Sequence, residues 1–190
     1  MIKSRIKSSI ELKEKILNNE LLINNIQQAA DLMLTCYNKD KKVWLCGNGG
    51  SAADAQHIAA ELSGRYYIDR DPLFAEALHV NTSYITAVAN DYSYNEVYAR
   101  YIKAAAKNGD ILIAISTSGN SKNIINAINE AKTNGVKIIS LTGETGGAMK
   151  NISDVLINVP SKDTPRIQES HILIGHILCE IIENDMFGQK

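Results

Sequence analysis

Residues 43–51 read Val43-Trp44-Leu45-Cys46-Gly47-Asn48-Gly49-Gly50-Ser51 and decide the fold of this 190-residue chain. Four apolar residues are typical of a buried strand, and the Gly-rich turn after them opens into a helical pattern over about 52–63. Backbone N–H groups in such a turn, together with the positive end of a helix, can bind an anionic or hydroxyl-rich ligand. His57 and Glu61 are four residues apart and share one helix face. The segment therefore predicts a ligand loop and a pair of side chains that can do chemistry.

The composition is that of an ordinary globular domain. The chain is 45% hydrophobic and 22% charged, with a formal net charge of −1, so it shows no basic face for nucleic acid. Its cysteines, Cys36, Cys46 and Cys179, have no metal-ligand spacing and are expected to be reduced thiols. Residues 1–20 lack the apolar core of a secretory signal, and Ile172–Ile182 is too short and too polar to span a bilayer. We therefore expect a soluble cytoplasmic protein without a nucleic-acid or membrane partner.

Apolar strands alternate with helical segments along the chain. Residues 1–40 show helical spacing, with Asn18-Asn19 as the break between two helices. Strands are expected at 43–46, 77–80, 111–115, 136–141 and 155–159, and helices at 52–63, 82–89, 95–106, 123–133 and from just after Pro165 to about 184. This alternation predicts a mostly parallel sheet with helices on both faces. In such α/β folds, ligands bind beyond the carboxyl ends of the strands.

A second small-residue loop, Ser116-Thr117-Ser118-Gly119-Asn120-Ser121, also follows a strand and precedes a helix. Hydroxyls and free N–H groups at a helix N-terminus can surround a phosphate without a lysine. The simpler interpretation is helix capping, but one residue suffices for a cap and this loop holds six small polar residues in a row. The sequence contains no Walker A motif, and the first loop lacks the third glycine of a dinucleotide fingerprint. A phosphorylated ligand is favoured, whereas hydrolysis of a nucleotide triphosphate is disfavoured.

The last helix adds Gln168, His171 and His176 as candidates. Spacing alone does not choose between the two histidines, and Gly175, almost directly over Gln168, is expected to leave open space there. His, Glu, Gln and His side chains together would suit a borderline metal such as zinc. The alternative for His57 and Glu61 is an exposed helical pair worth roughly 0.2–0.5 kcal/mol.

Other polar residues have simpler readings as well. Arg65 and Arg166 are possible sources of positive charge for a phosphate, with solvation as the default. Asn90-Asp91 could mark no more than the end of a helix.

Four motifs together resemble the sugar isomerase (SIS) domain family over almost the whole chain. They are GNGGSA from Gly47, HxxxELxGR from His57, STSGNS from Ser116, and RIQE from Arg166 with a histidine eight residues after Gln168. The resemblance is strongest to members that convert sedoheptulose 7-phosphate to D-glycero-D-manno-heptose 7-phosphate, the first step of bacterial heptose synthesis for lipopolysaccharide core or capsule precursors. It implies a three-layer α/β sandwich with a central parallel sheet. An N-terminal helical oligomerisation segment would cover 1–40 and the SIS domain 41–190.

The resemblance also implies roles for individual residues. Phosphate binding falls to Ser116, Thr117, Ser118 and Ser121. Contact with the sugar, or positioning of the loops, falls to Asn48, Gly49, Gly50, Ser51, Asn90 and Asp91, and Arg65 is expected to touch substrate. His57, Glu61, Gln168 and His176 match the family's zinc and catalytic positions, with Glu61 and Gln168 also contacting substrate, which favours His176 over His171. The family implies one Zn²⁺ per subunit in a homotetramer with active sites between subunits.

An aldose–ketose isomerase must remove a proton from a carbon beside a carbonyl and return it to the neighbouring carbon. We expect Glu61 to shuttle that proton and His176 to act as acid and base. One alternative is a non-catalytic SIS scaffold that binds the replication initiator, which stretches such as Asn95–Tyr101 would also suit. That relative lacks the full acid–base set, so the presence of Glu61 and His176 favours the enzyme. Another alternative is an isomerase or etherase for a different phosphosugar.

Overall fold

Five parallel strands form the middle layer of the molecule in the computed structural model, which describes residues 1–188. They are β1 (Val43–Cys46), β2 (Ala75–Ala77), β3 (Ile111–Ser116), β4 (Lys137–Thr142) and β5 (Val155–Asn158), in the order β2-β1-β3-β4-β5. Every neighbouring pair is parallel. The strand expected at 77–80 starts two residues and ends three residues earlier, because Ala75–Ala77 pair with Val43–Leu45 and the chain turns away after Leu78.

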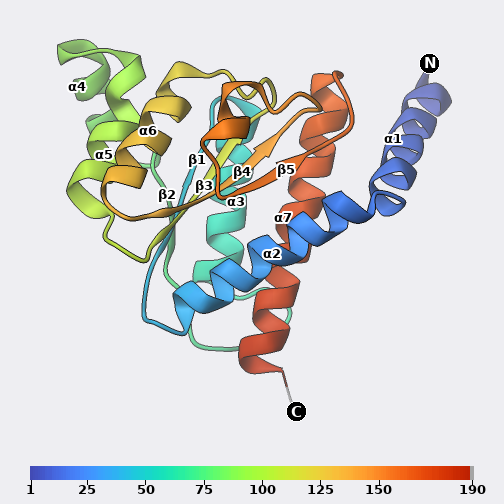
Figure 1. Ribbon diagram of the computed structural model, residues 1–190, viewed down its shortest axis with the longest axis horizontal. Coiled ribbons are helices and arrows are strands. Elements are labelled where there is room, and N and C mark those ends of the chain that lie inside the picture. Colours follow the sequence, from blue (N-terminus) through green and yellow to red (C-terminus); the bar gives the residue numbers. More distant parts are fainter. Residues whose placement is uncertain (189–190) are drawn as a thin grey trace.

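Helices cover both faces of the sheet, which confirms the three-layer sandwich (Figure 1). One face carries α2 (Glu20–Tyr37), α3 (Gly50–Ser63) and α7 (Thr164–Phe187), and the other carries α4 (Thr82–Asp91), α5 (Val97–Ala105) and α6 (Lys122–Thr133). A short 3₁₀ helix, η1 (Tyr94–Glu96), connects α4 to α5 on the second face. Another, η2 (Gly147–Asn151), lies in the connection between β4 and β5. Successive residues of β1 alternate between the two cores, so all four are buried.

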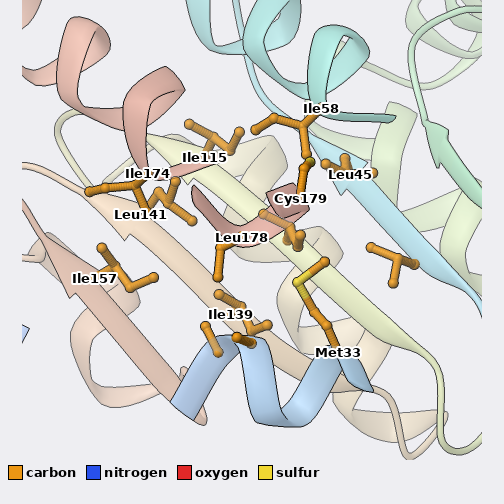
Figure 2. Packing of buried hydrophobic residues seen from close by; sticks show 14 of the residues in the cluster. Met33, Leu45, Ile58, Ile115, Ile139, Leu141, Ile157, Ile174, Leu178 and Cys179 are labelled. Carbon is orange, nitrogen blue, oxygen red and sulfur yellow. The ribbon is translucent and has the colours of Figure 1, made fainter. Parts of the chain in front are cut away.

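The core between the sheet and α3/α7 is tightly filled, as Figure 2 shows for Ile58, Ile174, Leu178 and Cys179. The open space expected beside Gly175 is absent, so that prediction is wrong. A Cβ at Gly175 would lie 2.5 Å from Cδ1 of Ile58 on α3. The glycine therefore lets α3 and α7 approach closely, and this contact sets the distance between the side chains that the two helices present.

The N-terminal segment consists of two helices, as expected. The amide oxygen of Asn19 accepts the N–H of Leu22 and caps α2, so the break at Asn18-Asn19 is confirmed. Helix α2 packs into the main core, whereas α1 (Ile2–Leu17) projects beyond α7 and exposes Ile2, Ile6 and Ile10 (Figure 1). Within residues 1–188, no helix is long and apolar enough to cross a membrane.

Helix α7 begins earlier than the sequence indicates. Thr164 and Pro165 form its first turn, where a missing N–H costs nothing and the fixed φ of proline suits the helix. The segment expected as one helix over 95–106 divides into η1 and α5. Strand β1 has the expected bounds, and the ends of the remaining helices and strands lie within three residues of expectation.

Candidate active site

The two small-residue loops flank the point where the strand order reverses. From β1 the chain passes to β2 on one side of the sheet, and from β3 it passes to β4 on the other. The loops that follow β1 and β3 therefore meet at a topological switch point, where open α/β sheets bind ligands. This placement supports the reading of both loops as ligand loops.

The loop after β1 is held from the second face of the sheet. Asn48 and Asn123 exchange amide hydrogen bonds of 2.9 and 2.8 Å, and the Tyr98 hydroxyl donates to the Gly47 carbonyl at 2.6 Å. Tyr94 donates to the same amide oxygen of Asn48. The amide of Asn48 is thus engaged within the protein, which suits a loop-positioning role better than a free sugar contact. Sequence reasoning missed Asn123, whose only signal was an amide in the first turn of the helix after the second loop.

Gly50 brings the same loop against α7. A Cβ at Gly50 would lie 2.5 Å from Nε2 of Gln168, so the glycine leaves room for that amide. Gly49 and Gly50 are exposed, whereas Ser51 is buried in the first turn of α3. The backbone of this loop, rather than its one hydroxyl, faces solvent.

The hydroxyls of the loop after β3 cluster as a phosphate site requires. Ser116 Oγ lies 3.0 Å from Ser121 Oγ and 3.5 Å from Ser118 Oγ. Ser121 is the N-cap residue of α6, yet its side chain makes no capping hydrogen bond. The first N–H groups of a helix have no intrahelical partner. In α6 that of Ile124 donates to Asn123 Oδ1 at 3.0 Å, which leaves those of Lys122 and Asn123 for a ligand beside these hydroxyls. The structure thus disfavours helix capping as the reason for this loop.

A second layer of backbone supports the phosphate loop. Gly119 has φ +66° and packs against the Gly146 carbonyl so closely that a side chain is excluded. Next to Thr117 and Ser118 is an open cavity of about 280 Å³, which Lys162 and Glu144 also line. Lys162 pairs with Glu144 at 3.1 Å and supplies a cation that sequence reasoning did not single out.

His57, Glu61 and His176 converge between α3 and α7. The Nε2 atom of His57 lies 3.0 Å from Glu61 Oε1 and 3.4 Å from His176 Nε2. Helical spacing places the first two on one face, and the close α3–α7 contact brings His176 to them. The side chain of His57 is 49% exposed and that of Glu61 25%, so the cluster is open to a substrate.

This cluster fits a metal ion. One ligand atom from each of the three residues lies within 4.8 Å of the others. Two ligands held about 2.05 Å from a tetrahedral zinc ion would be about 3.3 Å apart, close to the 3.4 Å between the imidazole nitrogens. Two imidazoles and a carboxylate are also a donor set that zinc accepts.

His171 is excluded from this cluster. It is fully buried, and its Nε2 lies 3.1 Å from the Thr142 carbonyl oxygen. Burial lowers the pKa of its imidazole to about 4, against the opposing effect of the Thr142 hydrogen bond, so the ring is neutral. The structure therefore assigns His171 to the core and leaves His176 as the accessible histidine of α7.

Other predicted residues lie apart from the cluster in the described chain. Asn90 and Asp91 are exposed at the end of α4, where the amide of Asn90 donates to Asp91 at 2.9 Å. Arg65 is exposed just after α3. Arg166 pairs with Glu169 on α7 and donates to the Arg5 carbonyl on α1. Its guanidinium is therefore engaged where α7 meets α1.

Comparison with known proteins agrees with this geometry. The model of the SIS domain family matches residues 6–143. A phosphoheptose isomerase of Sulfurimonas denitrificans is 55% identical over 98% of this chain and 96% of its own length. One of Clostridium acetobutylicum is 52% identical over 100% of this chain and 96% of its own length.

Solved structures extend the likeness to the fold. A phosphoheptose isomerase from Neisseria gonorrhoeae superposes with a TM-score of 0.91 at 42% identity, covering 96% of this chain and 97% of that one. One from Francisella tularensis gives a TM-score of 0.92 at 41% identity, covering 96% of each chain. The likeness spans both loops, α3 and α7.

Proposed function

Because the chain belongs to the SIS domain family and, within it, to the phosphoheptose isomerases, we propose that it converts sedoheptulose 7-phosphate to D-glycero-D-manno-heptose 7-phosphate. It is a phosphosugar aldose–ketose isomerase. The observation that carries this conclusion is the convergence of Glu61, His57 and His176 beside two ligand loops.

The reaction moves a proton from C1 of the ketose to C2 of the aldose through an enediolate. Glu61 is the proposed proton carrier, because its carboxylate is partly exposed and is oriented by His57 through a 3.0 Å contact. His176 is the proposed acid–base group for the sugar oxygens, since its Nε2 lies 3.4 Å from the His57 nitrogen that contacts Glu61. With both groups on rigid helices, the proton donor and acceptor stay in place as the carbonyl moves from C2 to C1.

The phosphate is proposed to bind at Ser116, Thr117, Ser118 and Ser121. Their hydroxyls and the N-terminus of α6 offer hydrogen-bond donors and a favourable dipole. The backbone of Gly49 and Gly50 would then meet the sugar chain between the phosphate and the cluster, next to Gln168. Asn90, Asp91 and Arg65 are also proposed to contact the substrate, in an active site that a neighbouring subunit would complete.

A zinc ion is the proposed cofactor. His57, Glu61 and His176 would hold it, with Gln168 as a further ligand. When bound, it would supply electrophilic stabilisation of the enediolate oxygens. Glu61 would then divide its carboxylate between holding the cation and carrying the proton.

Assembly and cellular role follow from the same proposal. The exposed isoleucines of α1 support a homotetramer built through the N-terminal segment, with active sites between subunits. The reaction would begin heptose synthesis in the cytoplasm for lipopolysaccharide core or capsule precursors. A replication-initiator scaffold gains no support, because the relatives at 52–55% identity are named as the enzyme.

The decisive experiment compares Glu61→Gln with Glu180→Gln, the loss of an exposed carboxylate one turn along α7 from His176. We expect Glu61→Gln to abolish turnover while sugar phosphate binding stays measurable by calorimetry, and Glu180→Gln to keep turnover. A parallel assay after chelation, with and without added Zn²⁺, tests the cofactor. Retained turnover in Glu61→Gln would remove Glu61 from the mechanism.

A further inference from the structure

Arg70 and Glu183 form a buried ion pair outside the set of proposed catalytic residues. Arg70 Nε donates to Glu183 Oε1 at 2.9 Å, and the side chains are only 2% and 1% exposed. Burying two charges is costly unless their remaining hydrogen-bonding capacity is satisfied. What these charges bind therefore indicates why the pair is present.

The guanidinium of Arg70 closes the C-terminal end of α3. It donates to the carbonyl of Glu61 at 3.0 Å and to that of Leu62 at 3.0 Å, with a longer bond to the Gly64 carbonyl. The last carbonyls of a helix have no intrahelical partner, and a cation is favourable there. Arg70 thus holds the backbone of the residue proposed as the proton carrier.

The carboxylate of Glu183 holds the segment that follows α3. It accepts the N–H groups of Tyr66, Tyr67 and Ile68 at distances of 3.0, 2.6 and 3.0 Å. Although burial opposes it, these N–H groups and Arg70 keep the pKa of Glu183 below its usual value, so the carboxylate stays charged. In this position the ring of Tyr66 lies 5.9 Å from that of His176, at a tilt of 32°.

We propose that Arg70 and Glu183 are positioning residues for the isomerase site, which fix the Glu61 backbone and place Tyr66 against His176. This inference rests on the proposed function. The pair joins α7 to the end of α3, so a single ion pair holds in place both Glu61 on α3 and the tyrosine beside His176 on α7. A shift of about 1 Å in such a constellation lowers turnover by up to about a hundredfold.

Asp110 offers a matched control. It is also a buried carboxylate, 2% exposed, and it accepts the N–H groups of Lys42 and Lys107 and the indole N–H of Trp44. It lies at the amino end of β3, opposite the ligand loops. Asp110→Asn therefore removes a buried charge without touching the site.

The test uses Arg70→Lys, which keeps a cation for Glu183 but cannot also reach the carbonyls of α3, and Glu183→Gln as a second variant. Turnover of sedoheptulose 7-phosphate is measured well below each melting temperature, and the histidine ring resonances are recorded by NMR. The variant Tyr66→Leu gives the reference position that the His176 resonance takes when no tyrosine ring lies beside it. The chain has only four histidines, so the assignment is tractable.

We expect kcat to fall by about tenfold to a hundredfold in Arg70→Lys, with KM within about threefold and the His176 resonance shifted toward its Tyr66→Leu position. Asp110→Asn should keep kcat and the resonance. Wild-type kinetics in Arg70→Lys and Glu183→Gln would overturn the proposal, as would failure of both to fold where Asp110→Asn folds. If the wild type does not turn over this substrate, the proposed function fails, while the NMR comparison still tests the positioning.

Discussion

Gly175→Ala tests the contact that sets the distance between α3 and α7. The added methyl carbon would lie 2.5 Å from Cδ1 and 2.7 Å from Cγ1 of Ile58, both well inside van der Waals contact. Ile58 is 1% exposed and is surrounded by the core, so it has little room to move. The helices must separate or Ile58 must leave its rotamer.

Two opposing terms decide the change in the free energy of unfolding. Overpacking of a core costs about 1–3 kcal/mol, whereas replacing glycine by alanine inside a helix gains about 1 kcal/mol. The net expectation is a loss of about 0–2 kcal/mol. In an Ile58→Ala background both contacting atoms are gone, so the same substitution should stabilise by about 1 kcal/mol.

The assay is a double-mutant cycle of Gly175→Ala and Ile58→Ala, followed by urea unfolding at one fixed protein concentration. Ile58→Ala alone should cost about 2–5 kcal/mol. The expected coupling between the two sites is about 1–3 kcal/mol, which is measurable for residues in contact. Equal stabilisation by Gly175→Ala in both backgrounds would refute the close contact.

Activity gives an independent reading of the same substitution. His176 is next to Gly175, and His57 is next to Ile58, so a wider helix spacing lengthens the 3.4 Å separation of the two imidazoles. We expect Gly175→Ala to lower kcat and affinity for Zn²⁺ together, with phosphate affinity unchanged. Unchanged kcat alongside a confirmed loss of stability would show that the site tolerates the movement.

Three further predictions concern residues around the site. Asn123→Ala should leave the half-buried Asn48 amide with only its Tyr94 contact, cost about 1–3 kcal/mol in urea unfolding, and lower kcat/KM in steady-state assays. Ser121→Ala should weaken inorganic phosphate binding about tenfold in calorimetry, yet cost no more than about 0.5–1.5 kcal/mol of stability, because its hydroxyl bonds to Ser116 but does not cap α6. The pKa of His171 is lowered to about 4 by burial, from about 6.5 in the unfolded chain, so the unfolded state takes up the proton first as pH falls. Stability should therefore drop by about 2 kcal/mol between pH 7.5 and pH 5, a loss that His171→Leu should lack in chemical unfolding at both pH values.

Local patterns could predict much of the fold. The bounds of β1 match the prediction because four apolar residues end at a glycine turn, and the break before α2 matches because Asn19 caps the helix. The position of β2 could not be predicted, since its register depends on pairing with β1 far along the chain. The space beside Gly175 was predicted wrongly for a similar reason: its occupant, Ile58, comes from another helix.

The candidate site divides in the same way. Helical spacing pairs His57 with Glu61, but spacing within α7 cannot choose between His171 and His176, because burial decides it. The resemblance to a family was needed to favour His176. Asn123 was missed because a buried asparagine in a first helical turn has the same sequence signature as an ordinary capping residue.

Three contacts along α7 explain why the site needs this long helix. Gln168 meets Gly50 at the start of α3, Gly175 meets Ile58 near its middle, and Glu183 reaches the end of α3 through Arg70. At about 100° per residue, Gly175 lies about 20° to one side of Gln168 around the helix and Glu183 about 60° to the other, so one side of α7 follows α3 along its length. His176 is next to the middle contact, and the other two contacts join α7 to α3 on either side of it. Because the proposed acid–base groups Glu61 and His176 lie on different helices, their separation depends on these contacts between α3 and α7. The two ligand loops then only have to place the sugar phosphate beside that pair.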